Sequence, residues 1–180
     1  MTTLLYALLA LALALGLLVT VGWRLPRTHT ATSRIRLPHP PETVWAVVRN
    51  LEGVPAWWTA VRGSERLSDP VGQERYRQTL GHNFTMTLMV TESMPRERLR
   101  TTIDTAPGAA FGGSWIYELK PAPEGTELRL TEEGWISNPL FRVITRVMGY
   151  HRTLDGYLAA LSRHFGESAR PEHVASRSPG

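Results

Sequence analysis

The sequence predicts an α+β fold in which a curved antiparallel sheet wraps around one long C-terminal helix. Two observations carry this prediction: strand-like segments over residues 75–136 and an apolar stripe at helical spacing over residues 139–165. A lone amphipathic helix that follows a strand meander has one obvious place to bury its apolar face, the concave side of the sheet. A sheet that curls around the helix without closing on it leaves a cavity between them.

The N-terminal segment predicts a transmembrane helix that precedes the sheet. Residues 4–23 carry no charge, and a helix of this length spans the roughly 30 Å hydrocarbon layer of a bilayer. A cleaved signal peptide is the alternative, but residues 1–3 lack a basic side chain and no Ala-x-Ala cleavage site follows. Arg24 and Arg27 follow the segment, so the positive-inside rule predicts that this single-pass anchor leaves the remaining chain in the cytoplasm; an export-oriented anchor is the alternative.

The charge pattern excludes several classes of protein. The chain has 20 basic and 16 acidic residues, and after residue 27 the two kinds are interspersed rather than gathered in the basic stripe that a nucleic-acid surface needs. It has no cysteine, which excludes disulfides, thiol nucleophiles and cysteine metal sites. We predict no nucleic-acid partner, and no motif indicates a cofactor or a metal site.

Composition divides the chain into four parts. Residues 1–27 are the anchor and its basic flank, and residues 28–32 form a polar linker. Residues 33–166 form the folded domain. Residues 167–180 are polar, and we expect them to be a disordered tail.

The folded domain begins with a strand and two short helical segments. Residues 33–37 alternate between polar and apolar side chains, as in a strand. Pro41 and Glu42 then start a helix that carries an apolar valine stripe. A second short helix or turn is expected at residues 56–61.

The sheet and the last helix follow. Period-two alternation predicts five strands, at residues 74–80, 84–91, 98–105, 115–119 and 126–136. Their spacing of about ten residues is typical of an antiparallel meander. Asn138 and Pro139 form a favourable helix start, and Gly166 is a plausible end.

Three short segments carry a family resemblance: residues 40–45 (PPETVW), residues 55–58 (PAWW) and residues 133–135 (EGW). With the element order, they resemble the START-like or SRPBCC superfamily, the polyketide cyclase/dehydrase and lipid-transport group. The resemblance covers about residues 32–165 and implies a helix-grip fold with a cavity for a hydrophobic or amphipathic, lipid-like molecule. The group also contains cyclases and partner-binding members, so the fold does not fix the function. The N-terminal anchor departs from the usual soluble member.

Three residues are candidates for catalysis. His151 lies on the apolar stripe of the last helix, either as an acid–base or ligand-binding group or as an edge histidine bonded to a strand. Asp155, one turn later, either orients His151 or forms a surface pair with it. Glu132 shares strand parity with Leu130 and is expected to point inward, unless the strand frays before Gly134.

Another group of side chains is expected to line the cavity or to pack in the core. They share an inward strand position, a place on the helix stripe, or an aromatic ring in a loop near the entrance. The predicted ligand-binding residues are Trp58, Met86, Leu88, Phe111, Trp115, Tyr117, Met148 and His151.

Three functions fit these observations. The favoured one is a membrane-anchored module that binds a hydrophobic molecule in an internal cavity. The second is a cyclase/dehydratase-type enzyme, which requires His151 and Glu132 to converge on one point of that cavity. The third is a structural or interaction domain whose interior is filled by its own side chains. A cavity of several hundred cubic ångströms supports binding, and a packed interior supports the third function.

Overall fold

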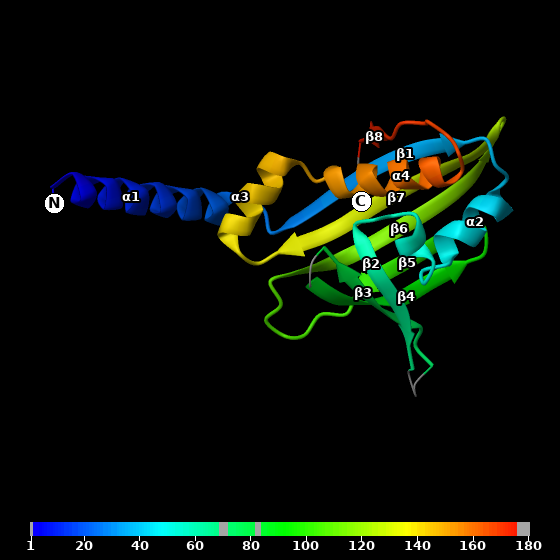
Figure 1. Ribbon diagram of the computed structural model, residues 1–180, viewed down its shortest axis with the longest axis horizontal. Helices are drawn as coiled ribbons and strands as arrows, with labels where there is room; N and C mark the ends of the chain where they lie inside the picture. Colours follow the sequence, from blue (N-terminus) through cyan, green and yellow to red (C-terminus); the bar gives the residue numbers. More distant parts are fainter. Residues whose placement is uncertain (1, 69–71, 82–83, 176–180) are drawn as a thin grey trace.

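The computed structural model describes residues 2–68, 72–81 and 84–175. The elements follow in the order α1 (Thr2–Arg24), β1 (Thr28–Leu37), α2 (Pro41–Arg49), the 3-10 helix η1 (Val54–Ala56), β2 (Val61–Leu67), β3 (Arg75–Leu80), β4 (Phe84–Met94), β5 (Arg98–Ile103), β6 (Phe111–Ala122), β7 (Gly125–Ile136), α3 (Pro139–Met148), α4 (Arg152–His164) and β8 (Glu172–Val174) (Figure 1).

The strands form one antiparallel sheet in the order β2-β3-β4-β5-β6-β7-β1-β8. The predicted α+β class and the strand meander are confirmed. Residues 28–32, predicted as a linker, are part of β1, since Thr28 already pairs with Trp135 of β7. The predicted disordered tail contains β8, which pairs with β1 at the sheet edge; residues 176–180 lie outside the described residues. The short helix or turn expected at residues 56–61 is the end of η1 followed by a turn, and β2 begins at its last residue, Val61.

Helix α4 lies on the concave face of the sheet and buries one side completely (Figure 1). Leu154, Leu158 and Leu161 are fully buried, because their spacing places them on one side of the helix. They share one core with inward-facing strand residues and with Val44 and Val48 of α2. Full burial of one such side chain contributes about 1.5–3 kcal/mol, so this face holds α4 on the sheet.

The prediction of one unbroken helix over residues 139–165 is wrong, because the chain forms two helices, α3 and α4. We call residues 149–151, which separate them, the joint. The start at Asn138 is confirmed, since its side chain accepts hydrogen bonds from two backbone N–H groups of the first turn. Helix α3 ends at Gly149, whose φ of 83° glycine adopts without steric cost. His151 is the N-cap residue of α4. The apolar stripe continues in the sequence across this joint, so periodicity alone does not reveal the break.

Helix α3 packs against α1 instead of the sheet centre. Gly22 is the buried residue of α1, and it lies against the first residue of α3, Pro139. A Cβ atom at Gly22 would come within 2.1 Å of the Pro139 carbonyl oxygen, so this close approach requires glycine.

Arg142 of α3 fastens the same contact. Its side chain is buried and donates hydrogen bonds to the carbonyl oxygens of Gly22 (3.1 Å) and Leu25 (3.3 Å), at the end of α1. It also donates to the carbonyl oxygens of Ile136 (2.9 Å) and Ser137 (2.7 Å), at the end of β7. We call this set of four hydrogen bonds the Arg142 clamp. It provides hydrogen-bond donors for carbonyl groups that have no partner within the last turn of α1. It also connects α1 directly to the folded domain.

Helix α1 is, among the described residues, the one helix long and apolar enough to cross a bilayer. Its apolar side chains are exposed, and it projects from the rest of the molecule (Figure 1). A membrane anchor and an N-terminal export signal share these properties.

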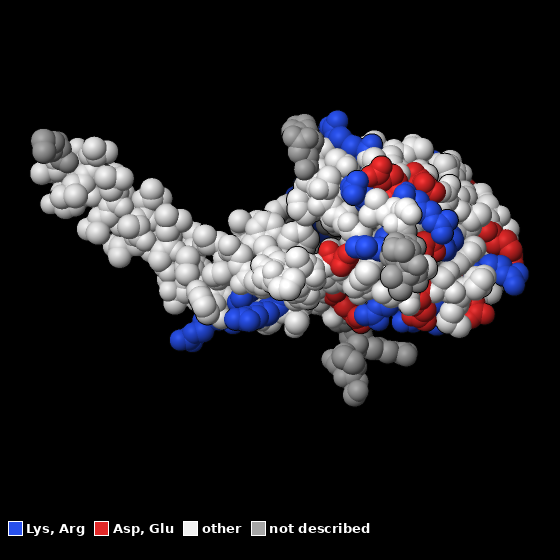
Figure 2. All heavy atoms as spheres, turned by 90° about the horizontal axis from the view of Figure 1, so that it is seen from below, with Lys and Arg blue, Asp and Glu red and all other residues white. Residues whose placement is uncertain are grey.

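The convex face of the sheet carries charges that pair across strands. Arg98 donates to Glu92 (3.0 Å) and Glu118 (2.9 Å), and Arg100 donates to Glu133 (2.9 Å). In the face seen in Figure 2, basic and acidic side chains are mixed over the folded domain, whereas α1 is almost free of charge.

Candidate functional site

A partly open cavity of about 470 Å³ lies between the concave face of the sheet, η1 and the joint between α3 and α4. Strand positions that face inward supply most of its walls, and these side chains are mainly apolar. The size falls within the ~300–1,000 Å³ typical of small-molecule sites. The interior of the domain is therefore not filled by its own side chains.

The inner end of the cavity is aromatic and is organised around Tyr157 of α4. Its ring centroid lies 5.0 Å from that of Trp57, 5.2 Å from Trp58, 5.6 Å from Trp115 and 5.7 Å from Tyr117. All four contacts have the edge-to-face geometry that aromatic pairs favour. Because Tyr157 is 2% exposed, these contacts fix its ring in place.

Two phenol groups add polarity to this aromatic end. Burial raises the pKa of both Tyr117 and Tyr157, so both stay neutral hydroxyl groups at physiological pH. The Tyr117 hydroxyl is close enough to raise the pKa of Tyr157 further. The pair nevertheless does not meet hydrogen-bond geometry, and Tyr157 Oη has no partner among the described residues. Tyr157 Oη is itself buried, so this oxygen is not exposed to the cavity.

A second polar group lies on the cavity wall. His29 Nε2 and Glu132 Oε1 are 3.1 Å apart, and Trp115 Nε1 donates to Glu132 Oε2 at 3.2 Å. The His29 ring stacks on Tyr150 of the joint, with centroids 4.3 Å apart. The His29 side chain is 9% exposed and the Glu132 side chain 24%. The wall thus presents a fixed donor–acceptor pair beside apolar surface.

The rim of the cavity is formed by exposed apolar side chains. Phe84, Phe141 and Met148 line the cavity and are 49%, 47% and 51% exposed. Phe111 lies beside Phe84, with ring centroids 5.7 Å apart. Since α3 supplies Phe141 and Met148, the opening lies on the α3 side of the molecule.

The structure places most of the predicted site residues on the cavity walls. Glu132 points inward, as its strand parity predicts. Those of the predicted ligand-binding residues that line the cavity are Trp58, Met86, Leu88, Phe111, Trp115, Tyr117 and Met148.

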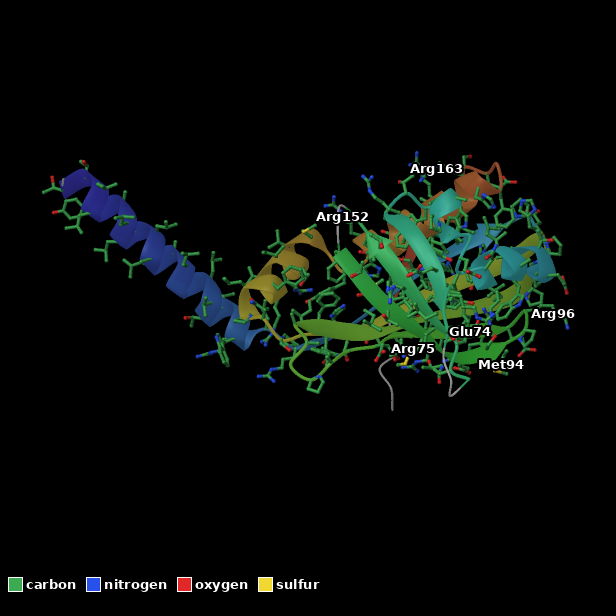
Figure 3. All side chains as sticks on the ribbon, turned by 60° about the horizontal axis from the view of Figure 1, so that its bottom comes forward. Glu74, Arg75, Met94, Arg96, Arg152 and Arg163 are labelled. Atoms are coloured by element: carbon green, nitrogen blue, oxygen red, sulfur yellow. The ribbon has the colours of Figure 1, made fainter. Side chains whose placement is uncertain are left out.

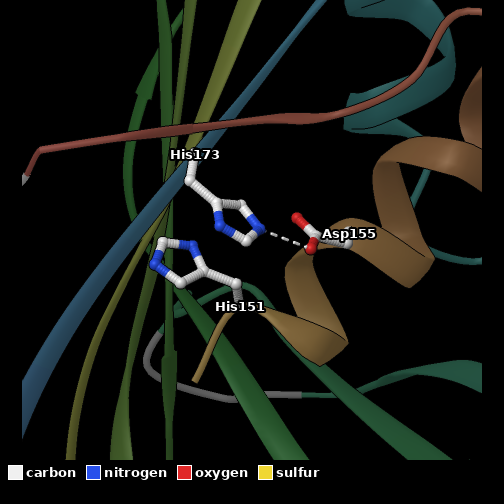
Figure 4. Close-up of side chains that lie close together, drawn as sticks. All are labelled: His151, Asp155 and His173. Carbon is white, nitrogen blue, oxygen red and sulfur yellow. Dashed lines mark hydrogen bonds and ion pairs between the residues drawn. The ribbon is translucent and has the colours of Figure 1, made fainter. Parts of the chain in front are cut away.

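His151 is not among the residues that line the cavity, so the structure agrees with the alternative of an edge histidine bonded to a strand and not with a ligand-binding role. Because the helix breaks before it, its ring turns to the sheet edge, where Nδ1 lies 3.2 Å from Ser33 Oγ and the ring stacks on His173 of β8 at 3.9 Å (Figure 4). Asp155 accepts hydrogen bonds from Ser33 (2.6 Å) and from His173 (2.8 Å). We call His151, Asp155 and His173 the edge cluster. It holds β8 at the sheet edge, and His151 does not meet Glu132 in the cavity, as the cyclase/dehydratase hypothesis required.

His29 and Tyr157 line the cavity but are not among the residues predicted to do so. The predicted linker contains His29, although positions 29, 31, 33, 35 and 37 share one strand parity and include Ile35 and Leu37. Continuing the alternation backwards through Ala31 would have found it. Tyr157 follows Leu154 by three residues, so helical spacing gave a signal that the stripe of leucines obscured.

Comparison of the sequence with family models matches residues 28–165 to polyketide cyclase / dehydrase and lipid transport proteins. The chain belongs to this family. The match begins at the first residue of β1 and ends just after α4, so it contains the cavity and leaves out α1. The predicted START-like membership is confirmed. Comparison with curated proteins finds no match.

Solved structures with the same fold include three that cover most of this chain. A conserved protein from Geobacillus kaustophilus has 16% identity and a TM-score of 0.63, over 81% of this chain and 100% of that one. The aromatase/cyclase Zhui from a Streptomyces species has 18% identity and a TM-score of 0.60, over 75% and 90%. A START superfamily protein from Mycobacterium smegmatis has 16% identity and a TM-score of 0.59, over 77% and 97%. At these identities the likeness shows the START-like fold and not the activity.

Proposed function

We propose that the protein is a membrane-anchored module that binds a hydrophobic or amphipathic, lipid-like small molecule in the cavity. The observation that carries this proposal is the open, mainly apolar cavity of about 470 Å³ between the sheet and α4. Membership of a family described by lipid transport supports the same ligand class.

The ligand has an apolar body and at least one polar group. Strand residues such as Met86, Leu88 and Ile103 offer apolar wall for the body. The paired His29 and Glu132 on the cavity wall offer hydrogen bonds for the polar group.

Helix α1 is the anchor in this proposal, and the folded domain lies on the cytoplasmic side. Arg24 and Arg27 flank the C-terminal end of α1, and no acidic residue occurs in that helix. The positive-inside rule therefore supports a cytoplasmic domain.

The test is mass spectrometry of small molecules that co-purify with the detergent-extracted full chain. Leu88→Trp fills the cavity, because Leu88 lines it. Met89→Trp is the matched control, because Met89 is the next residue of the same strand and does not line the cavity. We expect a bound amphiphile in the original protein and the control but not in Leu88→Trp. Equal amounts in both variants, or no bound amphiphile in any of them, would contradict the proposal.

A cyclase/dehydratase-type activity is the second candidate function, and the His29–Glu132 pair on the cavity wall favours it. An imidazole beside a carboxylate is a common acid–base arrangement. His29→Asn keeps a hydrogen-bonding side chain but removes the titratable group. Turnover of a bound polyketide-like substrate that is lost in His29→Asn while binding persists would support an enzyme; unchanged turnover would exclude His29 from the chemistry.

A further inference from the structure

Helix α3 presents an apolar face that no described part of the chain covers. Phe141, Ile144, Val147 and Met148 are 47%, 49%, 82% and 51% exposed. By contrast, the apolar face of α4 is buried against the sheet. The α3 helix contains no acidic residue, and its exposed charge is Arg146. An amphipathic helix of this composition is typical of those that lie in a membrane interface.

The position of α3 is fixed relative to α1. The Gly22–Pro139 contact and the Arg142 clamp join the two helices at the C-terminal end of α1. In Figure 1, α3 crosses this end of α1 and does not run alongside it. If α1 spans a bilayer, α3 therefore lies at the membrane surface, at the level of Trp23 and Arg24.

The charge around the contact between α1 and α3 matches a phospholipid surface. Arg24 and Arg27 are exposed at the end of α1, and Arg146 is exposed on α3. Figure 2 shows basic side chains gathered where α1 meets the folded domain, next to a long uncharged helix. Basic side chains at this level are attracted to anionic headgroups by about 1 kcal/mol each.

The opening of the cavity lies beside the same contact between α1 and α3. Phe141 and Met148 belong both to the rim and to the exposed face of α3, and Phe84 of β4 stands on the rim as well. In contrast, the exposed apolar side chain of Met94 lies at the far end of the molecule, away from α1 and α3 (Figure 3).

We infer that α3 is an interfacial helix that inserts its apolar face into the phospholipid bilayer and holds the cavity mouth against it. The occupant of this face is the bilayer that α1 spans. A ligand then passes between bilayer and cavity at the rim of Phe84, Phe141 and Met148 without crossing water. This inference rests on the proposed function for the role of α1 and of the cavity.

Depth-dependent fluorescence quenching in vesicles tests the inference. Because the chain has no cysteine, single cysteines can be placed and labelled with an environment-sensitive dye in the full chain. The sites are Val147→Cys on α3, Leu13→Cys within α1 and Met94→Cys as the exposed control. The vesicles contain phosphatidylcholine and phosphatidylglycerol, with spin-labelled lipids that quench at a shallow or a deep position.

We expect the dye at residue 147 to be quenched by the shallow label, at a depth of about 5–10 Å below the headgroups. The dye at residue 13 should be quenched by the deep label, and the dye at residue 94 by neither. The change Arg142→Met should reduce quenching at residue 147 several-fold and leave residue 13 unchanged.

The outcomes separate this inference from the proposed function. Quenching at residue 13 with none at residue 147 would overturn the interfacial role of α3 and leave the anchor intact. No quenching at residue 13 would overturn the anchor itself, and with it this inference. Ligand occupancy is measured independently by co-purification with the Leu88→Trp and Met89→Trp pair.

Discussion

Helices α3 and α4 share one apolar stripe in the sequence but have opposite surroundings in the structure. On α4 the stripe residues Leu154, Leu158 and Leu161 are 0% exposed, whereas on α3 Val147 is 82% exposed. Three residues, 149–151, separate the two helices. The comparison shows that an amphipathic period indicates an apolar face but does not indicate whether the sheet buries that face or leaves it exposed.

The largest difference between the two helices should appear in stability. Leu158→Ala leaves a cavity in the core and should lower the free energy of unfolding by about 2–5 kcal/mol. Ile144→Ala on α3 should change it by less than about 0.5 kcal/mol, because Ile144 is half exposed. Urea unfolding of the detergent-solubilised chain, followed by tryptophan fluorescence, measures both. A comparable loss in the two variants would show that α3 belongs to the core.

Loss of the Arg142 clamp should have the next largest effect. Arg142→Met keeps much of the apolar volume but removes the bonds to the ends of α1 and β7. Loss of a hydrogen bond to a charged group costs about 1.5–3 kcal/mol. We expect faster proteolysis between α1 and β1 than in the original chain. Arg146→Met is the control, because Arg146 is exposed on the same helix and should change nothing.

Two glycines near the joint should respond with opposite sign to the same change. Gly149→Ala should destabilise by about 1–2 kcal/mol, because φ at this position is 83°. Gly156→Ala lies within α4 with open space around the added Cβ, and should stabilise by about 0.5–1 kcal/mol. Thermal unfolding of the two variants side by side measures this. If Gly149→Ala also stabilised the protein, the joint between α3 and α4 could adopt a helical conformation.

The smallest expected effect is a pH dependence at the edge cluster. Burial, and next the charge of His173, lower the pKa of His151, whereas the charge of Asp155 opposes the shift. The unfolded chain therefore binds this proton more readily, so stability falls as the pH drops below about 6.5 and levels off below the folded pKa. Protection of β8 amides from hydrogen exchange should fall over that range. His151→Asn should flatten the profile; an unchanged profile would assign it to other groups.

Much of the sheet and of the cavity wall was predictable from the sequence. Period-two alternation placed Met86, Leu88, Trp115, Tyr117 and Glu132 on inward positions, and each lines the cavity. A strand has two faces, so parity settles which way a side chain points once one buried neighbour is known.

The misplaced residues depended on contacts that are remote in sequence. His151 followed the helical period, but the break at Gly149 redirected it, and its partners Ser33 and His173 come from β1 and β8. The polar run that contains His29 became a strand only because β7 pairs with it. Local propensity carries no information about such pairing.

The Arg142 clamp has a consequence for how such a protein operates in a cell. Three residues separate α1 from β1, and the clamp restricts the motion between α1 and the folded domain that a flexible linker would allow. If α1 anchors the protein as proposed, this short connection keeps the cavity beside the bilayer that α1 spans, so a bound ligand could not be carried to an opposing membrane. Exchange would then depend on lateral diffusion in that one membrane, which is a search in two dimensions.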